Sequence, residues 1–288
     1  MPGKRVPTNV RPVTRSELVR DLRQLGVRRD GVLMVHTRMS ELGWVVGGED
    51  VVVLALLEAI GESGTLAAYA GWDEDPYHLA SWPPEWKRAY LDELPAFDPA
   101  LMSSNHENGR IPERIRTWPG AARGEHPEAN LVAVGQRAAW LVSPHPYDDA
   151  YGAGTPLGRL VEADGQVLML GAPLETLTLL HHAEALANVP SKRRVTYRMP
   201  VIDNELRVWR ELHDIDTSSD GAFPYDRAVS AGEDPFAVIT AEALEAGCGR
   251  SSSVGMSTSY VFEARLLVDF AARWLEQHFN IGDARASG

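Results

Sequence analysis

The 288 residues carry 44% hydrophobic side chains, and 28 Lys and Arg against 40 Asp and Glu give a formal net charge of −12. A chain of this length can bury a core without disulfide staples, and its acidic balance disfavours a nucleic-acid or anionic-membrane partner. The single cysteine, Cys248, cannot form an internal disulfide, and no N-terminal apolar stretch resembles a signal peptide or membrane span, so we expect a cytoplasmic protein.

The first part of the chain alternates buried strands with helices. Thr14 and Glu17 form a capping-box pattern before a helix that Gly26 ends. The next predicted elements are a strand over 31–36 (GVLMVH), an apolar helix over 49–61 and a strand over 64–71 (GTLAAYAG). This alternation predicts an α/β layered fold with a largely parallel central sheet.

The second part continues the pattern and then changes character. Thr155 and Pro156 mark a helix start, and a strand at 165–172 (GQVLMLGA) leads into an apolar helix. The remaining predicted elements are a hairpin of 195–202 and 206–212 around DNE, a solvated acidic loop over 213–226, and closing helices over 240–247 and 260–279.

No repeat, low-complexity tract or linker divides the chain. We therefore expect one domain over residues 12–282, with loose termini at 1–11 and 283–288. In a sheet of this kind, ligands collect at the carboxyl ends of the strands. His36, the stretch 69–75 and the loop 171–176 fall at such ends, so we expect them to meet around one crevice.

The helix within residues 176–190 (TLTLLHHAEALANVP) places polar side chains in an apolar stretch. His181 and Glu184 are three residues apart and share a face, whereas His182 points about 100° away, so only one histidine can pair with the glutamate. A carboxylate that holds one ring nitrogen leaves the other free to accept a proton. The alternatives are a buried histidine with no chemistry, or a metal site that would need a third ligand from elsewhere, such as His126 or His145.

Several familiar signatures are missing from the chain. It contains no G-x-S-x-G elbow, no G-x-x-x-x-G-K-[ST] loop, no H-E-x-x-H and no C-x-x-C. A serine hydrolase, a P-loop enzyme and a thiolate zinc site are therefore disfavoured. Residues 23–28 (RQLGVR) also do not complete the R-x-x-G-x-G/A turn with which the common acetyltransferase superfamily binds coenzyme A.

Four segments in order resemble the aminoglycoside 3-N-acetyltransferases, most closely the actinobacterial members: VHTRMSELGWVVGGEDVVVLALLEAIGESGTLAAYAGW, EHPEANLVAVG, YGAGTPLGRL and GAPLETLTLLHHAEAL. The resemblance implies a three-layer α/β/α fold distinct from that of the GNAT superfamily. It also implies acetyl-coenzyme A (acetyl-CoA) as donor, no metal, and the 3-amine of the 2-deoxystreptamine ring of an aminoglycoside antibiotic as acceptor. Such a protein would bind small molecules and confer antibiotic resistance; its oligomeric state stays open.

The resemblance also assigns roles residue by residue. The family's L-H-x-A-E pattern falls on residues 180–184, so His181 becomes the proposed general base and Glu184 the group that orients it. A departure occurs at Glu175, where many members have aspartate. The residues expected to line the path of coenzyme A (CoA) are His36, Thr37, Arg38, Met39, Ser40 and Thr155.

A polycationic aminosugar needs carboxylates to replace its hydration. The candidates are Asp73, Glu107, Asp214 and Asp216, each of which is otherwise an ordinary surface acid. Residues 191–194 (SKRR) are expected to form a solvated basic turn, with contacts to the CoA phosphates as the alternative.

Two rival functions remain at this point. One is a metal-dependent hydrolase built on His181 and Glu184. The other is a protein that binds cationic sugars without chemistry.

Overall fold

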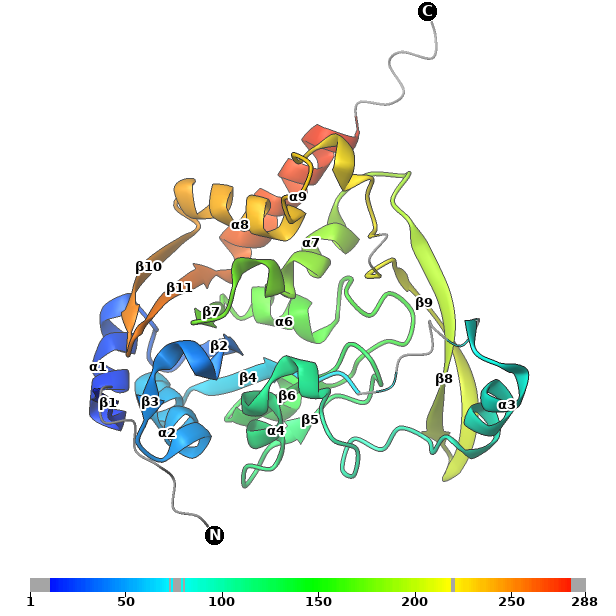
Figure 1. Ribbon diagram of the computed structural model, residues 1–288, viewed down its shortest axis with the longest axis horizontal. Coiled ribbons are helices and arrows are strands. Elements are labelled where there is room, and N and C mark those ends of the chain that lie inside the picture. Colours follow the sequence, from blue (N-terminus) through cyan, green and yellow to red (C-terminus); the bar gives the residue numbers. More distant parts are fainter. Residues whose placement is uncertain (1–10, 73, 75–78, 80, 219–220, 281–288) are drawn as a thin grey trace, which may run out of the picture.

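A mixed seven-stranded sheet lies at the centre of the computed structural model, which describes residues 11–72, 74, 79, 81–218 and 221–280 (Figure 1). Its strands, in spatial order, are β10 (Gly249–Val254), β11 (Ser257–Glu263), β7 (Gln166–Leu170), β2 (Val32–Thr37), β4 (Thr65–Tyr69), β6 (Leu131–Gly135) and β5 (Ala122–Arg123).

The predicted largely parallel sheet is wrong. Strand β2 pairs in parallel with β4 and β7, but the other four pairings in the described sheet are antiparallel. Helix-containing connections allow the parallel pairs, whereas only two residues, Gly255 and Met256, separate β10 from β11 and therefore impose an antiparallel hairpin. The coarser prediction of an α/β fold is confirmed.

The predicted end signals of the helices are confirmed. Thr14 and Glu17 form both hydrogen bonds of the capping box, and Gly26 ends the first helix in the left-handed region at φ +103°. The described helices are α1 (Arg15–Leu25), α2 (Gly48–Ile60), α3 (Pro84–Glu93), α4 (Arg110–Arg116), α5 (Ala138–Val142), α6 (Pro156–Glu162), α7 (Leu179–Leu186), α8 (Pro235–Glu245) and α9 (Ala264–Phe279). Short 3₁₀ turns are η1 (Met39–Leu42), η3 (His106–Asn108), η4 (Leu174–Thr176) and η5 (Tyr225–Arg227).

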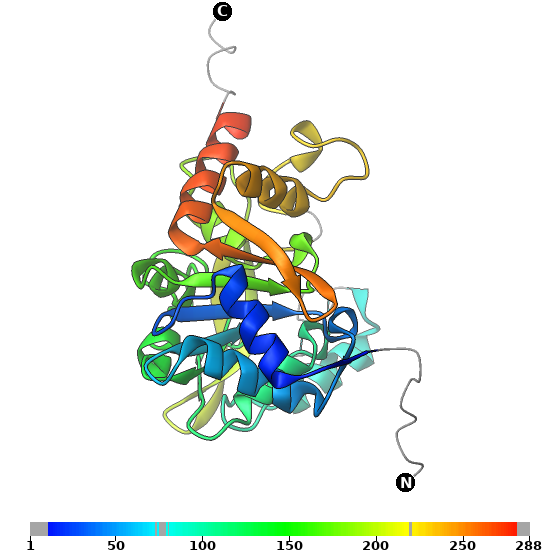
Figure 2. The same cartoon turned by 90° about the vertical axis from the view of Figure 1, so that its left-hand side faces the viewer.

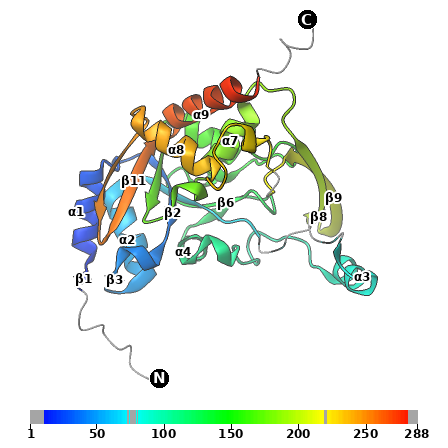
Figure 3. The same cartoon turned by 45° about the horizontal axis from the view of Figure 1, so that its top comes forward.

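The two faces of the sheet carry separate hydrophobic cores. Along β2, Val32 and Met34 belong to one core, and Leu33 and Val35 belong to the other, as the period of two in a strand requires. The first core receives residues of α5, α6, α7, α8 and α9, and the second receives residues of α1, α2 and α4. Figure 3 shows α7, α8 and α9 on one side of the strands and α2 and α4 on the other.

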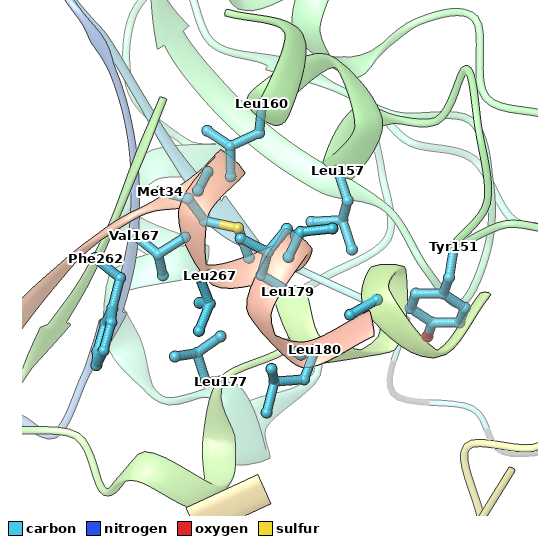
Figure 4. Packing of buried hydrophobic residues seen from close by; sticks show 14 of the residues in the cluster. Met34, Tyr151, Leu157, Leu160, Val167, Leu177, Leu179, Leu180, Phe262 and Leu267 are labelled. Atoms are coloured by element: carbon cyan, nitrogen blue, oxygen red, sulfur yellow. The ribbon is translucent and has the colours of Figure 1, made fainter. Parts of the chain in front are cut away.

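The packing of the first core determines where α7 lies. Figure 4 shows leucines of three helices around β2 and β7: Leu157, Leu160, Leu179, Leu180 and Leu267 surround Met34 and Val167. Burial of these side chains contributes about 25 cal/mol per Å² of apolar surface removed from water. Helix α7 is therefore anchored to the sheet by its apolar residues. At the other edge of the molecule, α1 packs beside β10 (Figure 2).

A long hairpin extends from the side of the main sheet (Figure 1). Strands β8 (Arg194–Asp203) and β9 (Leu206–Ile215) confirm the predicted hairpin, and both turn residues, Asn204 and Glu205, have positive φ. Its inner side packs against residues near α3 in a third cluster that includes Trp72 and Phe97. A separate parallel pair joins β1 (Pro12–Val13) to β3 (Trp44–Val45).

Two helix predictions near the C-terminal end need correction, and one strand was not predicted. The helix predicted over 240–247 is α8, which begins at Pro235, where Asp234 caps it. The helix predicted over 260–279 begins at Ala264, because residues 260–263 belong to β11. The aromatic and β-branched residues Tyr260, Val261 and Phe262 favour a strand there. Strand β10, which follows Cys248, is rich in serine and has no apolar pattern that predicts it.

The predicted loose termini lie outside the described residues, apart from Arg11, which forms an ion pair with Glu17. No helix in the described ranges combines the length and the apolar character that a membrane crossing requires.

The capping box at α1 leads to a prediction about stability. Thr14 accepts a hydrogen bond from the backbone N–H of Glu17, while Glu17 Oε2 accepts one from the backbone N–H of Thr14 at 2.9 Å. We expect Thr14→Ala to lower the free energy of unfolding by about 1 kcal/mol, because it leaves the backbone N–H of Glu17 without its acceptor. Urea denaturation measures the change. Thr14→Ser keeps the hydroxyl and is the control; equal losses in both variants would contradict the capping role.

Candidate active site

A first cavity opens where β2, β4 and β7 end. Its volume is about 380 Å³, and its described lining includes His36, Thr37, Tyr69, Ala172 and Pro173. These residues come from the three strand-end segments that the sequence predicted to meet, so that prediction is confirmed for the described residues. The parallel pairing of β2 with β4 and β7 brings the three ends to one edge.

A second cavity, of about 610 Å³, lies beside the first. It is bounded by α7, the start of α8 and the chain between β9 and α8, and both His181 and Glu184 line it. Glu175 lines both cavities, so the two adjoin at this side chain. A ligand that extends from one cavity into the other would therefore pass Glu175.

His181 and Glu184 form a hydrogen-bonded pair. The distance from His181 Nδ1 to Glu184 Oε2 is 2.7 Å, as expected for positions i and i+3 of a helix. The glutamate side chain is 3% exposed and the histidine side chain 22% exposed. Within the part of the chain that the structure describes, Nε2 of His181 has no hydrogen-bond partner. The ring therefore presents one nitrogen to the cavity while the carboxylate holds the other.

Aromatic rings fix the orientation of His181. The ring centroid of Tyr151 lies 5.2 Å from that of His181, and the centroid of Phe236 lies 4.9 Å away. Tyr151 belongs to the first core, and Phe236 is in the first turn of α8. Contacts from two elements restrict the rotation of the imidazole, which favours a single orientation of Nε2.

The C-terminal end of α7 is held by a half-buried cation. Lys192 Nζ donates hydrogen bonds to the backbone oxygens of Glu184, Ala185 and Ala187, at 3.1, 2.5 and 2.7 Å. A helix end with a positive charge at its free carbonyls is stabilised by about 0.3–1 kcal/mol. The expected solvated turn at residues 191–194 is therefore wrong for Lys192, because free carbonyls at a helix end compete successfully for an ammonium group.

His182 takes no part in the pair, as the helical spacing predicted. It is 2% exposed, and its Nδ1 donates to the backbone oxygen of Tyr151 at 2.6 Å. Burial lowers the pKa of His182, so the ring is neutral at pH 7. Its bond holds the segment that carries Tyr151 against α7.

The first cavity contains buried polar atoms without partners. Among the described residues, neither His36 Nε2 nor Thr37 Oγ1 has a hydrogen-bond partner. Burial lowers the pKa of His36 to about 4, so its ring is neutral and can either donate or accept a hydrogen bond. Unsatisfied buried groups of this kind cost free energy unless a ligand completes them. The lining thus fits a ligand with amide or carbonyl groups, such as the pantetheine arm of CoA.

The other residues predicted to contact CoA are distributed differently. Arg38 lines the first cavity, whereas Met39 packs on the second core and Ser40 is exposed beside Glu41. Thr155 is fully buried; its hydroxyl donates to Gly152 O at 2.8 Å and accepts from Gly158 N at 3.3 Å. The structure therefore gives Thr155 its predicted cap but does not place it in the described lining of either cavity.

The four predicted acids do not come together. Glu107 lines the first cavity, Asp216 lines the second, and Asp73 lies outside the described residues. Asp214 is 1% exposed within β9 and is in neither described lining. The solvated loop expected from residue 213 is therefore wrong at its start, because the strand continues to Ile215 and turns Asp214 inward.

Acidic side chains nevertheless dominate the second cavity. Its described lining contains the carboxylates of five residues and the guanidinium of Arg193, which lies 3.7 Å from Asp216 Oδ2. The five acids are Glu175, Glu184, Asp216, Asp226 and Asp234. Such a surface attracts cationic ligands.

The histidines considered as further metal ligands lie elsewhere. His126 and His145 are buried with their ring centroids 4.8 Å apart. The described residues contain no group of three or more His, Cys, Asp or Glu side chains that could hold a metal ion. The metal-site alternative thus lacks a ligand set in the part of the chain that the structure describes.

Sequence reasoning missed the aromatic surroundings of the pair. Tyr151, Phe236 and Tyr225 all come from other segments, and Tyr225 Oη donates to Glu184 Oε1 at 2.6 Å. No spacing relates these residues to α7. The one available signal for Tyr225 was the aromatic pair Phe223 and Tyr225 in a stretch otherwise read as acidic and solvated.

Comparison with known proteins identifies relatives along nearly the whole chain. A family model described as aminoglycoside 3-N-acetyltransferase matches residues 34–276. The chain is 51% identical over 266 residues to aminoglycoside N(3)-acetyltransferase VIII of Streptomyces fradiae, covering 92% of each protein. Among solved structures, it is similar to aminoglycoside acetyltransferase AAC(3)-Xa with a TM-score of 0.90 and 48% identity, over 93% of this chain and 94% of that chain. It is also similar to AAC-IIIb in a binary complex with CoASH, with a TM-score of 0.83 and 40% identity, over 93% and 98% of the two chains.

The buried Asp214 predicts a pH dependence of stability. Burial raises its pKa from 3.8 to about 7, so the folded protein retains a proton that the unfolded chain releases near pH 4. The free energy of unfolding contributed by this group therefore falls as the pH rises from about 4 to about 7 and is constant above that. We expect Asp214→Asn to remove this loss, so that the variant gains, relative to wild type, on the order of a few kcal/mol across this range.

Urea denaturation at several pH values measures the difference between the two proteins. The exposed Asp92→Asn is the control and should give a nearly constant difference. A constant difference for Asp214→Asn as well would contradict the assignment.

Proposed function

This chain belongs to the aminoglycoside 3-N-acetyltransferase family, and from that premise we propose that it transfers an acetyl group from acetyl-CoA to the 3-amino group of the 2-deoxystreptamine ring of aminoglycoside antibiotics. The resemblance found in the sequence is confirmed, including the closeness to actinobacterial members, since a relative at 51% identity comes from Streptomyces fradiae. The transfer would make a cell that contains the protein resistant to the antibiotic.

The donor is acetyl-CoA, the co-substrate of the family. We assign its pantetheine arm to the first cavity. The unpartnered His36 Nε2 and Thr37 Oγ1 support this assignment, because amide and carbonyl groups of the arm would complete them. Arg38 at the mouth would meet the anionic end of the coenzyme, with Met39 and Ser40 beside it. Thr155 would act indirectly, by fixing the start of α6.

The acceptor is a polycation, and we assign it to the second cavity. The carboxylates of Asp216, Asp226 and Glu175 would replace the water that its ammonium groups lose on binding. Glu107 would contribute from the neighbouring first cavity. Because Glu175 borders both cavities, an amine held there would approach the thioester from the side of His181.

His181 would act as the general base. An alkylammonium has no lone pair, so a base must take a proton before the nitrogen can attack the thioester carbon. His181 Nε2 accepts that proton. The Nδ1–H group stays hydrogen-bonded to Glu184, and this carboxylate fixes the tautomer of the ring and stabilises the imidazolium. A C–N bond forms and the C–S bond breaks; the nitrogen loses its second proton to the departing thiolate, and the proton held by His181 is released to water. Direct transfer of this kind needs no covalent enzyme intermediate.

The burial of Glu184 against His181 is the observation that most strongly supports this mechanism. The carboxylate of Glu184 is 3% exposed and holds Nδ1 of a histidine that faces an acidic cavity. A buried histidine with only a structural role, as His182 illustrates, would have no free face toward solvent.

The overall architecture is part of the proposal. We propose a three-layer α/β/α arrangement, distinct from the GNAT superfamily fold, in one domain over residues 12–282 of a cytoplasmic protein. The distribution of helices between the two cores of the sheet supports the layers. Strands from both ends of the sequence in one sheet support the single domain.

Activity can be tested directly. We expect release of free thiol from acetyl-CoA in the presence of aminoglycosides but not of unrelated amines, with a single added acetyl group on the 3-amine by mass spectrometry. The acidic second cavity predicts this preference for polycations. Binding of a cationic sugar without thiol release would favour the non-catalytic alternative.

The catalytic pair makes a sharper prediction. We expect His181→Ala to lower kcat by about 10²- to 10⁴-fold while binding of acetyl-CoA survives, because the base contributes to the proton transfer and not to the first cavity. Glu184→Gln should give a smaller loss. Steady-state kinetics and calorimetric binding measure the two effects. His213→Ala, which changes an exposed histidine of β9, is the control; wild-type turnover in His181→Ala at saturating substrate would contradict the assignment of the base.

A further inference from the structure

We propose that Tyr225 is a positioning residue for the acetyl transfer: its hydroxyl holds the Glu184 carboxylate in place and thereby sets the basicity of His181. The inference rests on the proposed function, in which His181 is the base. Tyr225 lies in η5, about 40 residues beyond α7 along the chain, and no motif links the two segments.

The two oxygens of the Glu184 carboxylate accept hydrogen bonds from different donors. Tyr225 Oη donates to Glu184 Oε1 at 2.6 Å, and His181 Nδ1 donates to Oε2 at 2.7 Å. Each oxygen of a carboxylate that is 3% exposed therefore has one hydrogen-bond donor. A buried carboxylate needs such donors, because an unpaired charge away from water is costly. Tyr225 thus stabilises the charge on Glu184 independently of His181.

The tyrosine remains a donor under all ordinary conditions. Burial raises its pKa well above the usual value, and the nearby negative charge of Glu184 raises it further. The hydroxyl therefore keeps its proton, and the hydrogen bond has one direction only.

Aromatic contacts hold the ring of Tyr225. Its centroid lies 5.8 Å from that of Phe223 and 5.6 Å from that of Phe279, both in edge-on geometry. Phe279 is the last residue of α9. The end of the longest described helix thus supports the ring of Tyr225, whose hydroxyl contacts Glu184 Oε1.

Other charged groups lie near Tyr225, Glu184 and His181. Asp234 lies at the start of α8, and Glu175, Asp216 and Asp226 line the same cavity with Arg193. Lys192 contacts the backbone oxygen of Glu184 and not its carboxylate. Among the described residues, His181 and Tyr225 are the hydrogen-bond donors to the carboxylate itself, so removing the tyrosine hydroxyl leaves the imidazole as its one described partner.

Removal of the hydroxyl has a defined direction. With Oε1 unsatisfied, the buried carboxylate interacts more strongly with the imidazolium, and the protonated form of His181 becomes more favoured. The base is then available only at higher pH. In Tyr225→Phe we therefore expect the acidic limb of the kcat profile to move up by about one pH unit, which lowers kcat about tenfold below the midpoint. The KM for acetyl-CoA should not change.

The test combines kinetics with a readout that needs no turnover. We would record the pH profile of kcat and, separately, the ¹⁵N NMR titration of the His181 ring in wild type and Tyr225→Phe. Tyr90→Phe is the matched control: it also removes a tyrosine–carboxylate hydrogen bond, from Tyr90 Oη to Glu74 Oε2 at 2.9 Å, in another part of the molecule. A shared upward shift of both midpoints in Tyr225→Phe, absent in Tyr90→Phe, supports the proposal.

Two further variants keep the test decisive if Tyr225→Phe does not fold. Tyr225→3-fluorotyrosine keeps the ring and makes the hydroxyl a stronger donor, so the midpoint should move down instead of up. In a Glu184→Gln background, Tyr225→Phe should have little additional effect on the midpoint, because the tyrosine acts through the carboxylate. Unchanged midpoints in both Tyr225 variants, or a shift of equal size with Glu184→Gln, would overturn the proposal. Absence of wild-type turnover would defeat the proposed function alone, and the NMR titration would still decide the role of Tyr225.

Discussion

A carboxylate buried in a helix needs a hydrogen-bond donor for each of its oxygens, and this requirement organises the region around His181. Glu184 satisfies it with His181 from its own helix and Tyr225 from η5. The second donor depends in turn on Phe279 at the end of α9. The burial of one acid thus joins segments that are far apart in sequence, and leaves Nε2 of His181 as the polar atom of the group that faces the cavity.

The mixed sheet places the two cavities side by side. The parallel pairings of β2 bring His36 and Tyr69 to one edge, and β7 delivers the chain that forms η4 and α7 at the same edge. The antiparallel strands extend the sheet away from this edge without contributing to it. The failure of the parallel prediction therefore does not affect the site, because the three strands that form the crevice are the ones that alternate with helices.

Features that depend on local chemistry could be predicted from the sequence, whereas features that depend on long-range contacts could not. The capping residues Thr14 and Thr155 and the pairing of His181 with Glu184 depend only on helical geometry, and a period of three or four residues is visible in a sequence. The inward turn of Asp214, the serine-rich β10 and the contact of Tyr225 depend on neighbours distant along the chain. No local pattern marks them, because the partner that stabilises each is chosen by the tertiary fold.

The cavities differ in charge, and a chain of hydroxyls connects their walls. Tyr69 in the first cavity donates to Glu128 O at 3.1 Å and so can accept from Tyr151, 3.2 Å away, whose ring packs against His181. His182 holds the backbone of Tyr151 from α7. The described lining of the first cavity sets Arg38 against Glu107 and Glu175, whereas that of the second sets five carboxylates against the single guanidinium of Arg193. In the proposed function, this difference in charge suits a thioester arm in the first cavity and a cationic amine in the second.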